Sequence, residues 1–301
     1  MIEQLISKTW ALEPRFNEVQ AALMLRKLSQ GGSMAEMKAA WDEQKAKHGP
    51  YLAPSNFGSA QSPVASHIGA DGKWKPWDLS QAKGGGVAII PMIGTMTRYG
   101  GMCSYGSEDF ASWIMEANSM DYVSSIVLEM NGPGGEVDGT EMLGAVVKNS
   151  RKPVVAYVAG MAASAHYWVA SQCREIIMES ETTSEVGSIG VLSMHVDASK
   201  FYEKEGYKIN IIRSDGSEDK ALYNSIEPLS AELLSTVKAE LNVVRGTFIK
   251  NVKAGRPGIS DDVFTGKMYF GKEAIKKGMA DSIGYLGDAV YRADLLASKS
   301  A

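Results

Sequence analysis

The chain has 301 residues, of which 45% are hydrophobic and 22% are charged, so it is neither disordered, nor collagen-like, nor a coiled coil. Lysine and arginine total 31 and aspartate and glutamate total 35, which gives a net charge of -4 and no broad positive field for nucleic acid. Two cysteines, Cys103 and Cys173, are too few for a disulfide framework or a zinc site. We expect no metal and no other cofactor. The first residues lack the pattern of a signal peptide.

Residues 1–82 are predicted to form a mostly helical N-terminal extension that ends in a linker. Apolar residues at helical spacing predict a helix within 14–47, whereas prolines and a glycine run make 49–86 rich in turns. The extension carries no motif that indicates chemistry. We expect it to pack on the main domain or to mediate assembly.

Residues 83–301 are predicted to form an α/β domain with a largely parallel sheet, because short β-branched strands alternate with helices. The uncharged segment 153–173 is long enough to cross a bilayer, but its proline, glycine and polar residues favour a buried strand, a turn and a helix. The expected strands are 87–94, 124–131, 151–160, 175–180, 187–197 and 207–214, and the expected helices are 107–119, 139–150, 162–172, 201–206, 229–255 and 271–278.

The first segment that could carry chemistry is the glycine turn at 130–139. A strand runs into Asn-Gly-Pro-Gly-Gly and then into a helix, and glycines there allow a ligand to approach the backbone closely. Successive N–H groups in such a turn can bind an anion. The alternative is a plain turn, and the residues match neither a Walker A loop nor a dinucleotide-binding motif.

The second segment is 158–171, where a buried strand gives way to a helix at Ser164. A hydroxyl in this position could act as a nucleophile, with the amide of Ala165 donating to the developing oxyanion. The alternative is a serine that only caps the helix.

A serine nucleophile needs a base, and two candidates follow it in the chain. Lys220 lies after a strand and a glycine-containing turn, and His195 lies within a predicted strand. His166 is two residues from Ser164 on the same helix, so their side chains should diverge. An exposed loop lysine and a structural histidine are the alternatives for Lys220 and His195.

The three segments together resemble the signal peptide peptidase A family of serine peptidases, which share the Clp protease and crotonase type of fold. The resemblance covers about 87–290 and includes a Gly-Ser-Ile-Gly-Val stretch at 187–191 and a closing tail at 266–284. It implies a Ser–Lys dyad of Ser164 and Lys220, with an oxyanion hole at Gly134, Gly135 and Ala165.

The resemblance also implies a substrate and a partner. The family's membrane enzymes usually carry Gly-Gly after the serine, where this chain has Ala165-His166, and no membrane anchor is evident. The pattern looks more like the phage and prophage head maturation proteases, so we expect a capsid or scaffold protein as substrate and a location in the host cytoplasm or the assembling virion. A lysine acts as a base near neutrality only when it is shielded from water or lies near a cation, so we expect a homo-oligomer.

Three alternatives stay open. The chain could be a signal-peptide or membrane-protein-fragment peptidase. It could be a non-catalytic shell-assembly protein with the same fold. It could also be a crotonase-like acyl-CoA enzyme, which likewise uses paired backbone amides, although such chemistry usually places an acidic residue in the pocket.

Overall fold

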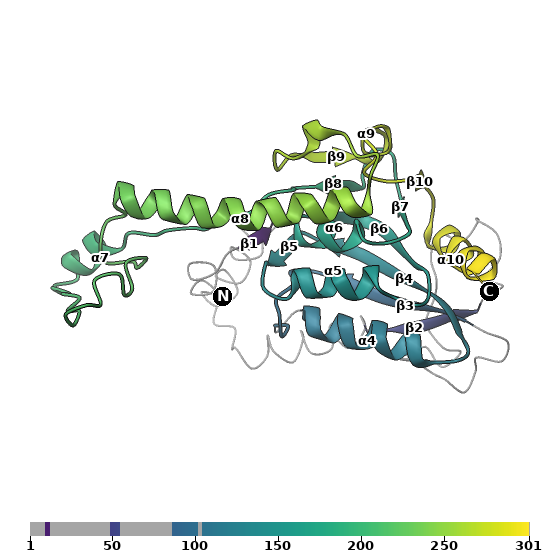
Figure 1. Ribbon diagram of the computed structural model, residues 1–301, viewed down its shortest axis with the longest axis horizontal. Coiled ribbons are helices and arrows are strands. Elements are labelled where there is room, and N and C mark those ends of the chain that lie inside the picture. Colours follow the sequence, from purple (N-terminus) through teal and green to yellow (C-terminus); the bar gives the residue numbers. More distant parts are fainter. Residues whose placement is uncertain (1–9, 13–48, 55–85, 102–103, 301) are drawn as a thin grey trace, which may run out of the picture.

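The computed structural model describes residues 10–12, 49–54, 86–101 and 104–300 (Figure 1). The helix predicted within 14–47 and most of the linker lie outside these residues. Two short pieces of the predicted extension are described, and both are strands: β1 (Trp10–Leu12) and β2 (Tyr51–Pro54). Both pair with strands of the main domain, whose predicted start at residue 83 stays a prediction.

The domain is built on an eight-stranded, largely parallel sheet with the order β10-β7-β6-β4-β3-β2, and β8 pairs with β6 and β9 beyond this path. The pairs β2–β3 and β8–β9 are antiparallel, and the other pairs of this sheet are parallel. The predicted α/β class with a largely parallel sheet is therefore confirmed. The remaining strands are β3 (Gly86–Ile93), β4 (Val123–Gly132), β6 (Val154–Ala163), β7 (Glu175–Met178), β8 (Glu185–Gly187), β9 (Met268–Phe270) and β10 (Ser282–Ile283).

Helices cover both faces of the sheet. Alternate residues of a strand point to opposite faces, so Ile90 and Met92 of β3 join one buried cluster and Val87 and Ile89 join another. The first cluster includes residues of α4 (Ser107–Ser119), α5 (Thr140–Lys148), α6 (Ala165–Ala170) and α9 (Gly271–Lys276). The second includes four residues of α10 (Leu286–Ser300), a helix that the sequence reading missed.

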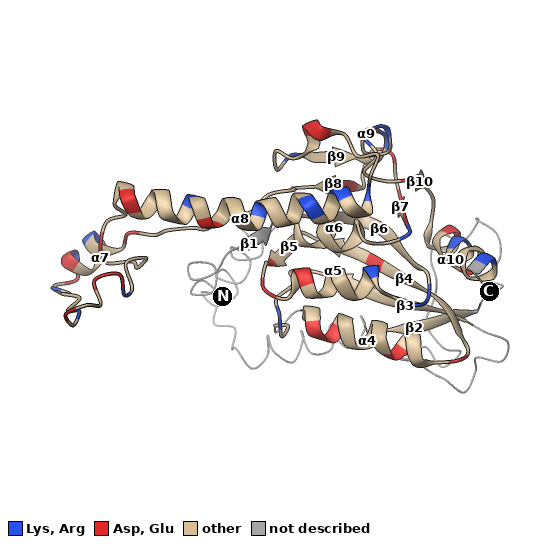
Figure 2. Ribbon diagram, in the orientation of Figure 1, with Lys and Arg blue, Asp and Glu red and all other residues tan. Residues whose placement is uncertain are grey.

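Acidic residues lie in the first turns of α4 and α5, where they complement the positive ends of the helix dipoles (Figure 2). Asp109 accepts a 2.9 Å hydrogen bond from the amide of Gly106, the residue that caps α4. Arg98 donates to Glu108 of α4 and to Asp138, which precedes α5, both at 2.8 Å, so it links the starts of the two helices.

Residues 190–247, which we call the arm, extend from the domain. The arm contains α7 (Ser199–Lys204) and most of α8 (Ala231–Gly255), and no residue in it is buried. The strand predicted at 187–197 is wrong beyond Gly187, and the strand predicted at 207–214 is wrong throughout. Among the described strands, none pairs with 207–214, and 188–197 contains only an isolated bridge at Leu192. Only the end of α8 is anchored in the core, through Phe248 and Val252.

The C-terminal tail closes the sheet, as the family resemblance implies, because β10 pairs with β7. Asp281 accepts two hydrogen bonds from the Arg256 guanidinium, at 2.7 and 2.8 Å, and its amide donates to Ile176 of β7. Gly278, with φ +71, follows the end of α9. Among the described residues, no helix is both long and apolar enough to cross a bilayer, and 153–173 forms β6 and α6 as predicted.

Candidate active site

The glycine turn and Ser164 come together at the carboxyl ends of two neighbouring strands. β4 ends at Gly132 and β6 at Ala163, and Gly132 is paired with Ala162 in the parallel register. Because β4 and β6 are adjacent and run in the same direction, the loops that follow them meet at one edge of the sheet. The structure therefore brings these two predicted segments into one site.

Ser164 has a backbone conformation that a residue with a side chain rarely adopts. Its φ is 55° and its ψ is −116°, between the end of β6 and the first residue of α6. Its amide donates to the Gly187 carbonyl at 2.7 Å, and its carbonyl accepts from Trp168 at 2.8 Å. The main chain is thus held on both sides in a strained turn, the kind of feature that concentrates at functional sites.

The Ser164 side chain does not cap α6. The residue is fully buried, and no hydrogen-bond partner for its Oγ occurs in the described part of the chain. A capping serine would accept a bond from an amide of the first helical turn, and α6 shows no such bond. A buried hydroxyl without a partner is costly, so its presence favours a role in chemistry.

The second half of the site is β5 (Gly134–Glu136), a short strand that follows the turn. Met96 donates to the Gly134 carbonyl and accepts from the Glu136 amide, both at 2.9 Å. The N–H and C=O of the residue between them, Gly135, therefore point to the opposite edge of β5. A Cβ at Gly135 would lie 1.7 Å from the Met96 carbonyl oxygen, and Gly134 has φ +105, so the geometry requires glycine at both positions.

Ala165 carries the second amide that the sequence predicts for an oxyanion hole. It is the first residue of α6 and is fully buried, and the first amides of a helix have no acceptor within the helix. α6 has only six residues, so its dipole is short. An oxyanion hole at this position would therefore depend on the individual N–H of Ala165.

His166 is a buried residue of the site whose contacts the sequence reading did not anticipate. Burial lowers the pKa of its imidazole to about 4, partly opposed by a hydrogen bond to the Met92 backbone, so the ring is neutral at pH 7. Its Nδ1 has no hydrogen-bond partner among the described residues. A Cβ at Gly132 would lie 2.3 Å from its Nε2, which explains the glycine before Pro133.

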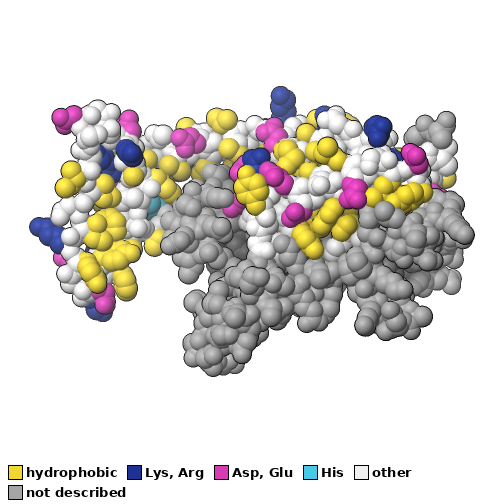
Figure 3. Space-filling view, turned by 90° about the horizontal axis from the view of Figure 1, so that it is seen from below, with side chains coloured by type: hydrophobic (Ala, Val, Ile, Leu, Met, Phe, Trp, Pro, Cys, Tyr) yellow, Lys and Arg dark blue, Asp and Glu magenta, His cyan; other side chains and the backbone are white. Residues whose placement is uncertain are grey.

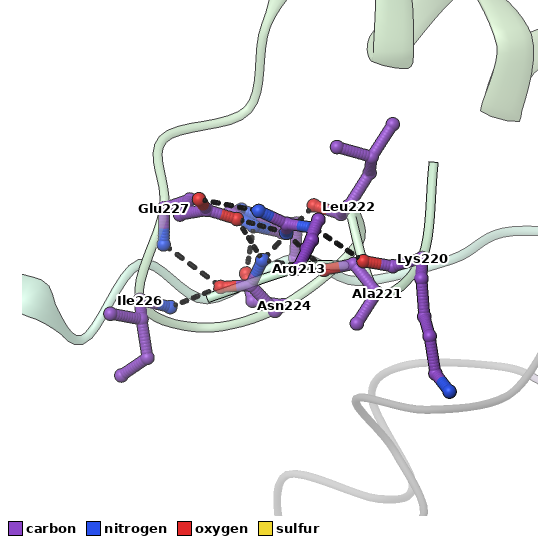
Figure 4. Close-up of polar contacts among 8 residues, drawn as sticks. Arg213, Lys220, Ala221, Leu222, Asn224, Ile226 and Glu227 are labelled. Carbon is purple, nitrogen blue, oxygen red and sulfur yellow. Dashed lines mark hydrogen bonds and ion pairs between the residues drawn. The ribbon is translucent and has the colours of Figure 1, made fainter. Parts of the chain in front are cut away.

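Lys220 does not meet Ser164 within one chain. It belongs to the segment between α7 and α8. Figure 1 shows this segment at the end of the arm that is remote from α6. Its side chain is exposed and points away from the surrounding polar network (Figure 4). No ion pair joins it to another residue in the described ranges, and the nearby Glu218 carboxylate instead accepts from the Gly216 amide at 3.0 Å.

The loop that carries Lys220 is nevertheless well defined. Arg213 donates to the Lys220 carbonyl at 2.6 Å and forms an ion pair with Glu227 at 2.5 Å. Asn224 donates to Glu227 and to the carbonyl of Ala221, which has φ +56. Hydrogen bonds from Arg213 and Asn224 lower the pKa of Glu227 to about 2, which keeps this network charged at neutral pH.

His195 has a structural environment. Its Nε2 lies 2.7 Å from the Asn224 carbonyl oxygen, and its ring makes an edge-on contact with Tyr223. Because it lies in the arm, it is not brought to Ser164 within the chain either.

A strained, buried serine beside a glycine strand at the end of a parallel sheet is the arrangement of a serine hydrolase. The chain belongs to peptidase family S49, whose family model matches residues 147–299. The predicted resemblance to this family of peptidases is thus confirmed.

Three curated relatives illustrate the range of the family. The chain is 27% identical to Protease 4 of Haemophilus influenzae over 64% of this chain and 32% of that protein. It is 30% identical to the head-tail preconnector protein GP5 of Enterobacteria phage P21, over 68% and 42% of the two chains. It is 32% identical to capsid assembly protease C of Escherichia phage lambda, over 68% and 48%. The matches therefore span between about a third and a half of the relatives' own length.

Proposed function

We propose that the chain is a serine endopeptidase that uses a Ser–Lys dyad of Ser164 and Lys220. The Ser164 hydroxyl attacks the carbonyl carbon of the scissile peptide bond, and the uncharged Lys220 amine accepts its proton. The resulting ammonium then protonates the leaving amine, and water hydrolyses the acyl-enzyme by the same route. The single observation that carries this proposal is Ser164 itself, whose backbone is strained and whose buried hydroxyl has no hydrogen-bond partner among the described residues.

The oxyanion of each tetrahedral intermediate would be held by the amides of Gly135 and Ala165, while Gly134 positions the strand. Each donor of this kind is typically worth about 3–4 kcal/mol of transition-state stabilisation. An extended substrate would add as a strand along the edge of β5 to which the Gly135 amide points.

The base would come from a neighbouring subunit of a homo-oligomer. A lysine loses its proton near neutrality only when it is shielded from water or lies near a cation, and Lys220 is exposed in the single chain. The arm also carries hydrophobic side chains on its surface (Figure 3). The large exposed ones include Phe201 (63%), Tyr207 (65%), Ile212 (92%) and Val243 (72%). Contact of these side chains with a second copy would bury them and would bring Lys220 to the neighbour's Ser164.

The substrate class proposed is a capsid or scaffold protein of a phage or prophage, cut during shell assembly in the host cytoplasm or the assembling virion. The similarity to a phage capsid assembly protease and a phage preconnector protein supports this choice over the processing of signal peptides. The similarity to Protease 4 keeps the second substrate class as the alternative.

Hydrolysis of a fluorescein-labelled unfolded polypeptide tests the proposal. The wild-type chain should release fluorescent fragments, whereas Ser164→Ala and Lys220→Ala should be inactive with an unchanged circular dichroism spectrum. Full activity in either variant would refute the corresponding assignment. A wild-type chain that assembles but shows no hydrolysis would instead support a non-catalytic shell-assembly protein.

A further inference from the structure

The outer edge of β5 is already occupied by a segment of the same chain. β1 pairs with β5 in antiparallel register, with Trp10 opposite Glu136, Ala11 opposite Gly135 and Leu12 opposite Gly134. Figure 1 shows β1 beside β5, far in sequence from the strand it joins. Since Met96 holds the other edge of β5, β1 lies on the only remaining edge of this three-residue strand.

The register places β1 opposite the amide on which the proposed mechanism depends. The N–H and C=O of Gly135 point away from Met96 and therefore toward β1, so Gly135 and Ala11 form the hydrogen-bonded pair of this ladder. The Ala11 carbonyl then faces the Gly135 amide, where a scissile carbonyl would be bound. The antiparallel direction carries the chain from Glu136 toward Gly134, the end of β5 nearest the glycine turn.

We propose that residues 10–12 are a substrate-like occupant of the peptide-binding edge of β5, which another polypeptide must displace before it can be cut. This inference rests on the proposed function, which assigns the binding of extended substrate to this edge of β5. A ladder of three residues is short enough to exchange, because an isolated two-stranded pairing is only marginally stable. The N-terminal extension would therefore lower the apparent affinity for substrate.

Proline at position 11 provides a sharp test, because it removes the N–H that Ala11 directs to β5. Ala11→Ser retains this N–H and is the matched control. Both changes are made in the full-length chain that carries Ser164→Ala, so no cleavage can complicate the result. Hydrogen exchange of the Gly135 amide should be about tenfold faster with Ala11→Pro and unchanged with Ala11→Ser.

Equal exchange rates at Gly135 in the two variants would overturn the proposal. This measurement does not depend on hydrolysis, so it separates a failure of the occupant from a failure of the proposed peptidase activity. The Glu136 amide, which donates to Met96, is the internal reference and should exchange equally in both variants.

Kinetics of the chain with an intact Ser164 give the second readout. Ala11→Pro should lower the KM for an unfolded polypeptide about fivefold, with little change in kcat, whereas Ala11→Ser should match the wild type. Removal of residues 1–11 by the wild type, and not by Ser164→Ala, would also support a substrate-like register. An unchanged KM in an Ala11→Pro chain of full length would count against competition.

Discussion

The amide of Ser164 donates a 2.7 Å hydrogen bond to the carbonyl of Gly187, which joins the candidate nucleophile to the start of the next loop. This bond helps to hold Ser164 at φ 55°, a conformation that costs about 1–3 kcal/mol for a residue with a side chain. Two substitutions of Ser164 can therefore distinguish the effect of backbone strain on stability from the effect of losing the hydroxyl.

We expect Ser164→Gly to be more stable than Ser164→Ala by about 1 kcal/mol, because glycine relieves the strain and loses only part of this gain to chain entropy. Both variants lack the hydroxyl and should be inactive. Urea unfolding of the two variants at pH 7 measures the difference in the free energy of unfolding. A more stable alanine variant would show that the turn is not strained.

A mixture of two inactive variants should recover activity if the dyad forms between chains. Ser164→Ala retains Lys220, and Lys220→Ala retains Ser164, so a mixed oligomer contains complete sites at their shared interfaces. When the two are co-expressed in equal amounts, about a quarter of the wild-type rate is expected, because each site draws both chains at random.

Each variant expressed alone is the control for this experiment and should be inactive. If the mixture is as inactive as its components while the wild type is active, Lys220 does not act across an interface.

Gly135→Ala should abolish hydrolysis, because its Cβ would lie 1.7 Å from the Met96 carbonyl oxygen and would displace β5 from the site. The loss of one oxyanion donor typically lowers kcat by about 100- to 1000-fold. Gly258→Ala is the matched control, since a Cβ there meets no atom within 4 Å. Single-turnover rates of the two variants test the prediction, and similar rates would exclude Gly135 from the oxyanion hole.

The free energy of unfolding should fall between about pH 6.5 and pH 4 through His166. Burial lowers the pKa of this imidazole from 6.5 to about 4 in the folded chain. The unfolded chain therefore binds more protons in this window, so the stability is fully present above pH 6.5 and decreases as the pH falls. The contribution of this group amounts to about 3 kcal/mol.

The variant His166→Asn does not titrate in this range and isolates the effect. Urea titrations at pH 7, 5.5 and 4 should show a steeper loss of stability for the wild type than for the variant. Parallel curves would mean that the imidazole is accessible to protons in the folded chain.

The core of the fold follows from local sequence patterns, but its periphery does not. Apolar runs bounded by glycine and proline predicted β3, β4 and β6 because these strands are buried on both faces of the sheet. The segment 207–214 has similar β-branched residues but pairs with no strand in the part of the chain that the structure describes, and Ile209 and Ile212 are exposed. Propensity alone could not show this difference. The pairing of β1 with β5 joins segments more than a hundred residues apart and has no local signal.

The candidate site divides in the same way. The meeting of Ser164 with the glycine turn could be predicted, since adjacent parallel strands bring their carboxyl ends together. The contact of His166 with Gly132 depends on close packing that no spacing reveals. The position of Lys220 relative to Ser164 could not be predicted from the sequence. Its loop lies on the arm, in which no residue is buried, so no pattern of core residues indicates where the loop lies.

The root of the arm touches the helix that begins after Ser164. Trp168 of α6 stacks on Phe248 of α8 with their ring centroids 4.4 Å apart and their planes 9° apart. Under the proposed dyad, a neighbour that docks on the arm would therefore contact an element that packs directly on α6, as well as exchange Lys220. An isolated molecule is then inactive because it lacks a base. Proteolysis would begin only where the local concentration of the protein is high enough for copies to associate.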